Sequence, residues 1–225
     1  MAKPMFDADA LIAMFESASA RQGAQLKKAA SDATLAALHG RELSLKNIRS
    51  ALKQVADAAS AGVAKNLTAG VDPEALLDKA VAGMDEAMLK AVEANRTALS
   101  TLMAQGADMR DKHLQKALED LEKMEDSLFG AIKKAAEGAG APMAGAWGPI
   151  LEKMQAGGSL SGAQASLTAE QMTQQMQTAV RSTRAASMKA AQALAESYTA
   201  MVSGVLIGMS EALQNAGSAK KPAKK

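Results

Sequence analysis

The stretch from Asp72 to Ala136 constrains the fold more than any other part of the sequence, because it is the longest run whose apolar residues keep a helical spacing. It contains no proline after Pro73. Asp72, Pro73 and Glu74 have the order of a helix start, with a capping acid, a proline at the first helical position and an acid in the first turn. The sequence therefore predicts a long helix, or a helix pair, over residues 71–137.

Two apolar stripes follow one another along this central stretch. Between them, Gly106 can end one helix and Asp108 can cap the next, so a break or kink is favoured. The alternative is one continuous helix of roughly 90 Å. The first stripe comprises Val81, Met84, Met88, Val92, Asn95, Leu99 and Met103, and the second comprises Leu114, Leu118, Leu121, Met124, Leu128, Ile132 and Ala135.

The composition favours helices with thin contacts between them. Aromatic residues make up only 2% of the chain, so the side chains that usually supply large buried areas are scarce. Strong helix formers such as alanine, leucine and methionine dominate instead. We therefore predict an all-α fold, either an elongated antiparallel helical bundle or a coiled-coil-like assembly of long amphipathic helices.

Residues 1–70 are expected to form amphipathic helices. Asp7 or Asp9 can cap the first of them, Gly23 interrupts its pattern, and Gly40 can end it. Ser44 can cap the next helix. The apolar stripe of that helix comprises Leu45, Ile48, Leu52, Val55, Ala59, Val63 and Leu67.

Residues 138–167 are rich in Gly, Pro and Ser, and we expect them to be mostly linker, with one possible short helix from Pro149 to Gln155. The only tryptophan, Trp147, lies in this segment. Docking of Trp147 onto neighbouring helices is the favoured interpretation. Contact with a lipid or polymer surface is the alternative.

A last long helix is predicted over residues 168–216, with Thr168 and Gln171 at the spacing of a capping box. Near its end the run MVSGVLIGM is apolar on all sides. Extended back to Tyr198 it reaches about 18 Å, well short of the roughly 30 Å of a bilayer core, so we predict no membrane span. Residues 217–225 are expected to be a disordered basic tail.

No pattern in the sequence predicts catalysis. The chain lacks the nucleotide-binding and nucleophile motifs, and it has no cysteine for a thiolate or a disulfide. His39 and His113 lack a partner at a metal-ligand spacing. We therefore predict a non-enzymatic protein with no catalytic residue, no metal, no cofactor and no small-molecule substrate. The start of the chain is a poor match to a signal peptide, which favours a cytoplasmic location.

The opening FDADALIAMF, with Phe6, Asp7, Asp9, Leu11, Met14 and Phe15, and the ending AKKPAKK resemble bacterial phasins and their relatives on polyhydroxyalkanoate granules. Two further blocks, ALEDLEKMEDSLFGAIKKAA and MVSGVLIGMSEAL, are similar to an uncharacterised bacterial helical family. The phasin resemblance implies a protein that coats the hydrophobic polymer, with apolar helix faces toward the polymer and charged faces toward the cytoplasm.

The side chains expected to contact such a surface, or a partner protein, are the large apolar ones near the two ends and the single tryptophan. They are Phe6, Leu11, Met14, Phe15, Trp147, Tyr198, Met201, Val205, Leu206 and Met209. The lysines of the tail, Lys220, Lys221, Lys224 and Lys225, are candidates for contact with an anionic partner, or serve solubility alone.

Two other functions remain open at this point. The chain can be a helical scaffold or coiled-coil homo-oligomer whose apolar stripes meet other helical proteins, with its 15 methionines filling the seams between helices. A contact with the nucleoid through the basic tail is a lesser alternative, because the remainder of the chain is slightly acidic.

Overall fold

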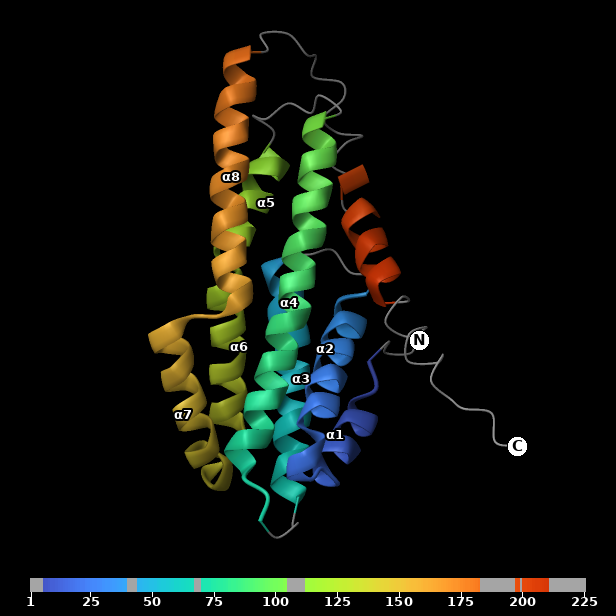
Figure 1. The fold of residues 1–225 in the computed structure, drawn as a ribbon, viewed down its shortest axis with the longest axis vertical. Coiled ribbons are helices and arrows are strands. Elements are labelled where there is room, and N and C mark those ends of the chain that lie inside the picture. Colours follow the sequence, from blue (N-terminus) through green and yellow to red (C-terminus); the bar gives the residue numbers. More distant parts are fainter. Residues whose placement is uncertain are drawn as a thin grey trace, which may run out of the picture.

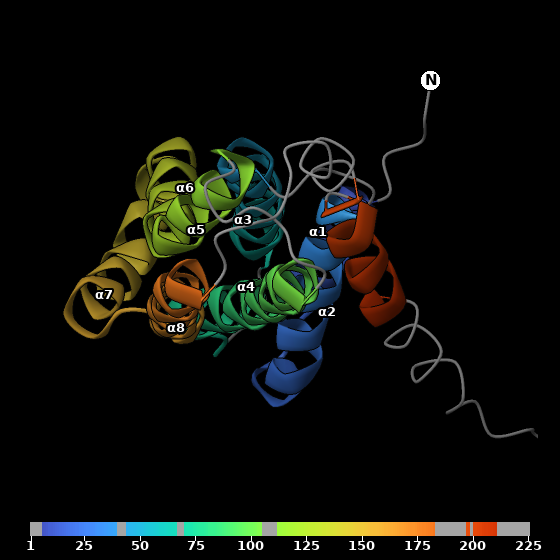
Figure 2. The same ribbon diagram turned by 90° about the horizontal axis from the view of Figure 1, so that it is seen from above.

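The helix α4 (Pro73–Ala104) lies in the middle of the molecule, and other helices pack around it (Figures 1 and 2). The structure is a computed structural model that describes residues 6–39, 44–66, 70–104, 112–182, 197–198 and 200–210. The predicted start of α4 is confirmed, because the Asp72 carboxylate accepts a hydrogen bond from the Glu74 amide at 3.0 Å. The first apolar stripe is also confirmed, since Val81, Met84, Met88, Val92, Asn95 and Leu99 are buried.

The predicted break after α4 is confirmed by the direction of the chain. The next helices, α5 (Lys112–Glu122) and α6 (Met124–Gly138), run antiparallel to α4, so one continuous helix is wrong (Figure 1). Gly106 lies outside the described residues. The second apolar stripe is buried at Leu118, Leu121, Met124, Leu128, Ile132 and Ala135.

In the described residues before α4 the α-helices are α1 (Ala8–Glu16), α2 (Gly23–Leu38) and α3 (Leu45–Lys65). The predicted caps are confirmed, because the Asp7 carboxylate accepts from the Ala10 amide at 3.0 Å and the Ser44 hydroxyl accepts from the Asn47 amide at 3.4 Å. Gly23 begins α2, and a short 3-10 turn (Ala20–Gln22) precedes it, so α1 and α2 are separate helices that lie against one another.

The prediction of a linker over residues 138–167 is wrong. Helix α7 (Ala141–Gly157) occupies most of that segment, and α8 (Leu160–Ser182) begins within it. Of the glycines that suggested a linker, only Gly140 and Gly158 lie in turns, with φ angles of 79° and 66°, and the others lie within helices. Between these turns, α7 buries Met143, Trp147 and Ile150, which are spaced as one helix face.

The prediction of one helix over residues 168–216 is wrong in its described parts. Thr168 does not cap a helix, because α8 begins eight residues earlier and Thr168 is buried inside it. Residues 200–210 form a further helix on the opposite side of α4 from α8 (Figures 1 and 2). We call residues 200–210 the C-terminal helix.

Among the residues that the structure describes, the buried apolar side chains form two clusters. The main core includes residues from α1 to α8 and holds Phe15, Trp147 and the stripe of α4. A smaller cluster joins the C-terminal helix to α2 and α4. Within the part of the chain that the structure describes, no helix is both long and apolar enough to cross a membrane.

Candidate functional site

The predicted contact residues at the start of the chain lie on or next to α1, and most of them face inward. Phe6 and Leu11 are 8% and 4% exposed, and Phe15 is fully buried. Met14 is the exception, with 41% of its surface exposed. In this conformation, therefore, Met14 alone among these four side chains is open to a partner.

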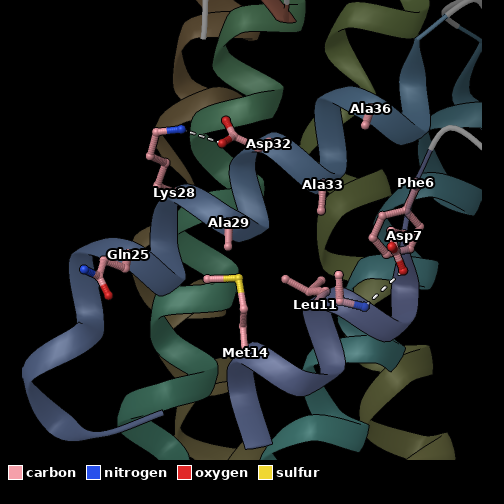
Figure 3. A pocket seen from close by; sticks show the side chains of 11 residues that line it. Phe6, Asp7, Leu11, Met14, Gln25, Lys28, Ala29, Asp32, Ala33 and Ala36 are labelled. Atoms are coloured by element: carbon pink, nitrogen blue, oxygen red, sulfur yellow. Dashed lines mark hydrogen bonds and ion pairs between the residues drawn. The ribbon is translucent and has the colours of Figure 1, made fainter. Parts of the chain in front are cut away.

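Met14 lies in a groove of about 500 Å³ between α1 and α2, where it points toward Ala29 (Figure 3). An ion pair between Lys28 and Asp32, 2.6 Å long, borders the groove. A second groove of about 820 Å³ lies on the α3 side of α1 and includes Ile12. Grooves therefore flank the N-terminal half of α1 on both sides.

The other end of α1 is held firmly. The Asn66 side-chain amide donates to the carbonyl oxygens of Phe15 and Ala18, at 2.9 and 3.0 Å. At Gly62 the backbones of α1 and α3 approach so closely that a Cβ would lie 2.5 Å from the Ile12 carbonyl oxygen. Both features place the C-terminal half of α1 in the core rather than at a free surface.

Trp147 is fully buried, and its indole Nε1 donates a hydrogen bond to the Ser60 hydroxyl at 3.1 Å. The favoured interpretation, docking onto neighbouring helices, is confirmed. The Ser60 hydroxyl in turn donates to the Ala56 carbonyl oxygen at 2.8 Å, so the indole N–H joins a satisfied polar pair.

The predicted contact residues near the other end lie on the C-terminal helix or just before it. Leu206 is buried, whereas Met201, Val205 and Met209 are only half-buried. Tyr198 is also half-buried and touches both apolar clusters. Burial raises the pKa of Tyr198, and the negative charge of Asp120 raises it further. The four lysines of the tail lie outside the described residues.

Two exposed leucines on α8 were missed by the sequence analysis. Leu160 and Leu167 are 75% and 53% exposed, and their seven-residue spacing places them on one helix face. The spacing was visible in the sequence, but the linker interpretation of residues 138–167 removed any reason to use it.

The start of α8 is capped by carboxylates from two other helices. Asp85 of α4 accepts hydrogen bonds from the amides of Leu160 and Ser161 at 3.0 and 2.9 Å. Glu125 of α6 accepts one from the Ser159 amide at 2.8 Å. Both acids compensate the positive end of the helix dipole, so they attach α8 to α4 and α6.

Replacing Asp85 with asparagine should lower the free energy of unfolding by about 1–2 kcal/mol, the usual range for loss of a helix cap. An amide group offers one acceptor oxygen to the two donating amides and carries no charge. Urea unfolding followed by circular dichroism measures the change. Asp32→Asn is the matched control. Asp32 is in an exposed ion pair, so this substitution should lower the free energy of unfolding by less than about 0.5 kcal/mol. Equal losses in the two variants would contradict the capping role.

Glu86 on α4 is the centre of an ion-pair group on the described surface. Glu86 binds Lys27 at 3.0 Å and Lys90 at 3.1 Å. Burial alone would raise the pKa of Glu86, but hydrogen bonds from the two lysines lower it below its ordinary value. This ion pair with Lys27 joins α2 to α4. No group of three or more acids or histidines in the described residues is arranged to hold a metal ion.

Comparison with known proteins gives the chain a family without a known activity. No curated protein and no solved structure gives a significant match. One family model matches residues 1–215, which is nearly the whole chain. The chain therefore belongs to the family of unknown function DUF6781.

Proposed function

We propose that this protein is a phasin-like, non-enzymatic protein that coats or organises the surface of hydrophobic polymer granules, namely polyhydroxyalkanoate, through its amphipathic helices. On such a granule the apolar helix faces lie against the polymer and the charged faces remain in the cytoplasm. The same chain would act as a homo-oligomer, as an elongated bundle or a coiled-coil-like assembly.

The observation that supports the proposal is a set of buried polar atoms without hydrogen-bond partners on the helices of the core. Among the described residues, three buried polar atoms have no hydrogen-bond partner: Ser31 Oγ, Asn95 Oδ1 and Thr168 Oγ1. Each unpaired buried polar group costs on the order of 1–3 kcal/mol. They lie on α2, α4 and α8, so the cost falls on the central helix and on two helices that pack against it.

Small residues weaken a further contact of α4, the one with the C-terminal helix. The face of α4 toward the C-terminal helix consists of alanines, and an alanine buries much less apolar area than a leucine or phenylalanine. Helix pairs of this kind gain little from packing. Replacing a helix neighbour with an apolar surface therefore costs little free energy. Burial of apolar side chains against that surface contributes about 25 cal/mol per Å² of apolar area removed from water.

A fluorescent fusion of the full chain, expressed in cells that accumulate polyhydroxyalkanoate, should concentrate on granules stained with a lipophilic dye. The same fusion in cells grown without granules should be diffuse. Fractionation into granule, membrane and soluble pools provides a second measurement. A fusion that stays diffuse in granule-filled cells would contradict the proposed function.

A helical scaffold is the second candidate, and the exposed pair Leu160 and Leu167 favours it. Seven-residue spacing of leucines on an open helix face is the pattern of a helix–helix contact between chains. The localisation experiment separates the two functions. A diffuse fusion that purifies as an oligomer would support the scaffold, and a compact monomer without a partner would count against it.

A further inference from the structure

The C-terminal helix is seated on α4 by very few side chains. Val202 and Leu206 are 2% and 1% exposed, and they rest on a row of α4 alanines together with Leu35 of α2. The row, which we call the alanine seat, consists of Ala87, Ala91, Ala94 and Ala98. Apart from Tyr198, which touches both, this small cluster is separate from the main core.

Two half-buried side chains of the C-terminal helix, Met201 and Val205, pack against the same small cluster. The exposed residues of this helix are Ala200, Gly204 and Gly208. No charged residue occurs between Glu196 and Glu211. In the fold, therefore, large apolar side chains of an uncharged helix meet the small cluster, while its small residues meet water.

Release of this helix costs less than release of α1. Release of α1 would expose Leu11 and Phe15, break the two hydrogen bonds from Asn66, and open the close approach at Gly62. Release of the C-terminal helix exposes Val202, Leu206, Leu35 of α2 and small alanines, and it uncovers the packed sides of Met201 and Val205. It opens no close backbone approach of the kind found at Gly62. Release of the C-terminal helix therefore requires less free energy than release of α1.

We propose that the C-terminal helix leaves the alanine seat and lies flat on the neutral apolar surface of the polymer, which makes it the granule-contact element of the proposed function. Two observations select this occupant. The helix carries no lysine or arginine that would attract an anionic lipid surface. Its described residues reach about 16 Å, half of a bilayer core, so the helix lies on a surface rather than spanning one.

A disulfide that locks the helix to its seat tests the proposal, and the native chain has no cysteine to interfere. One cysteine replaces Ala91 or Ala94, the other replaces Val202 or Leu206, and the pair that oxidises completely is used. Binding is measured by co-sedimentation with purified polyhydroxybutyrate particles. We expect the oxidised chain to bind at least tenfold more weakly than the wild type, and reduction with dithiothreitol to restore binding. Single-cysteine variants under the same oxidant are the controls.

A second variant changes the seat and leaves the helix intact. Ala91→Leu on the seat should push the helix off and strengthen binding to the particles several-fold. Ala75→Leu is the matched control, because Ala75 lies on an exposed face of α4, and it should leave binding unchanged. Circular dichroism confirms that each variant is folded.

The outcomes separate the two proposals. If the wild type fails to bind polymer particles, the proposed function is wrong. If the wild type binds while the lock and Ala91→Leu have no effect, the function stands and the C-terminal helix is not the contact element. Equal or tighter binding to neutral or anionic phospholipid vesicles, abolished by the same lock, would overturn the choice of a polymer surface.

Discussion

Replacing Trp147 with alanine should lower the free energy of unfolding by about 3–5 kcal/mol, the range observed when a large buried aromatic side chain is truncated. Trp147 is fully buried and is the largest side chain in the core. The chain has few other aromatic residues with which to fill the space that the indole would leave. A loss of this size is a large part of the stability of an ordinary domain.

Urea unfolding followed by circular dichroism measures this loss. Trp147→Phe keeps most of the apolar volume and removes the hydrogen bond to Ser60, whose hydroxyl still donates to the Ala56 carbonyl oxygen. Trp147→Phe should therefore lower the free energy of unfolding by a smaller amount, about 1–2 kcal/mol. Met14→Ala, at a position with 41% exposure, should cost less than about 1 kcal/mol. Losses of similar size for Trp147→Ala and Met14→Ala would show that Trp147 is not a core anchor.

Much of the fold was predictable from local patterns. The stripes on α3 and α4 follow from apolar residues spaced by three or four, and the structure buries them. The starts of α1, α3 and α4 follow from capping residues whose hydrogen bonds are present. These predictions succeeded because each depends only on residues within one helix.

Helices α7 and α8 could not be predicted in the same way. Seven glycines within residues 138–167 are typical of a linker, and Pro149 is a further signal against a helix there. The residue one turn before Pro149 is Gly145, which has no side chain to add to the crowding there. Burial of Trp147 and capping of α8 by Asp85 and Glu125 stabilise this region through contacts distant in sequence.

The candidate site was predictable only as a set of apolar residues. An amphipathic pattern shows that a face is buried, but it does not show whether the neighbour is the same chain or another surface. Phe15 and Leu206 look alike in the sequence. In the structure, α1 buries Phe15 against α3 in the main core, whereas Leu206 rests on alanines.

A comparison of two glycines tests how closely the helices approach. Gly83→Ala should lower the free energy of unfolding by about 2 kcal/mol, because overpacking typically costs 1–3 kcal/mol. A Cβ at Gly83 would overlap the Lys27 carbonyl oxygen and lie 2.8 Å from the Ala30 Cβ, so α2 and α4 would have to separate. A backbone carbonyl, unlike the end of a flexible side chain, cannot move aside without moving its helix.

The matched control is Gly130→Ala in α6, where a Cβ would meet no atom within 4 Å. Alanine is the better helix former, so this variant should gain about 0.5–1 kcal/mol. The two glycine-to-alanine substitutions should therefore differ by about 3 kcal/mol in their effect on the free energy of unfolding, measured with urea. If both variants gained stability, α2 and α4 would not meet at Gly83. The ion pair between Lys27 and Glu86, one turn from this crossing, would then also be absent in solution.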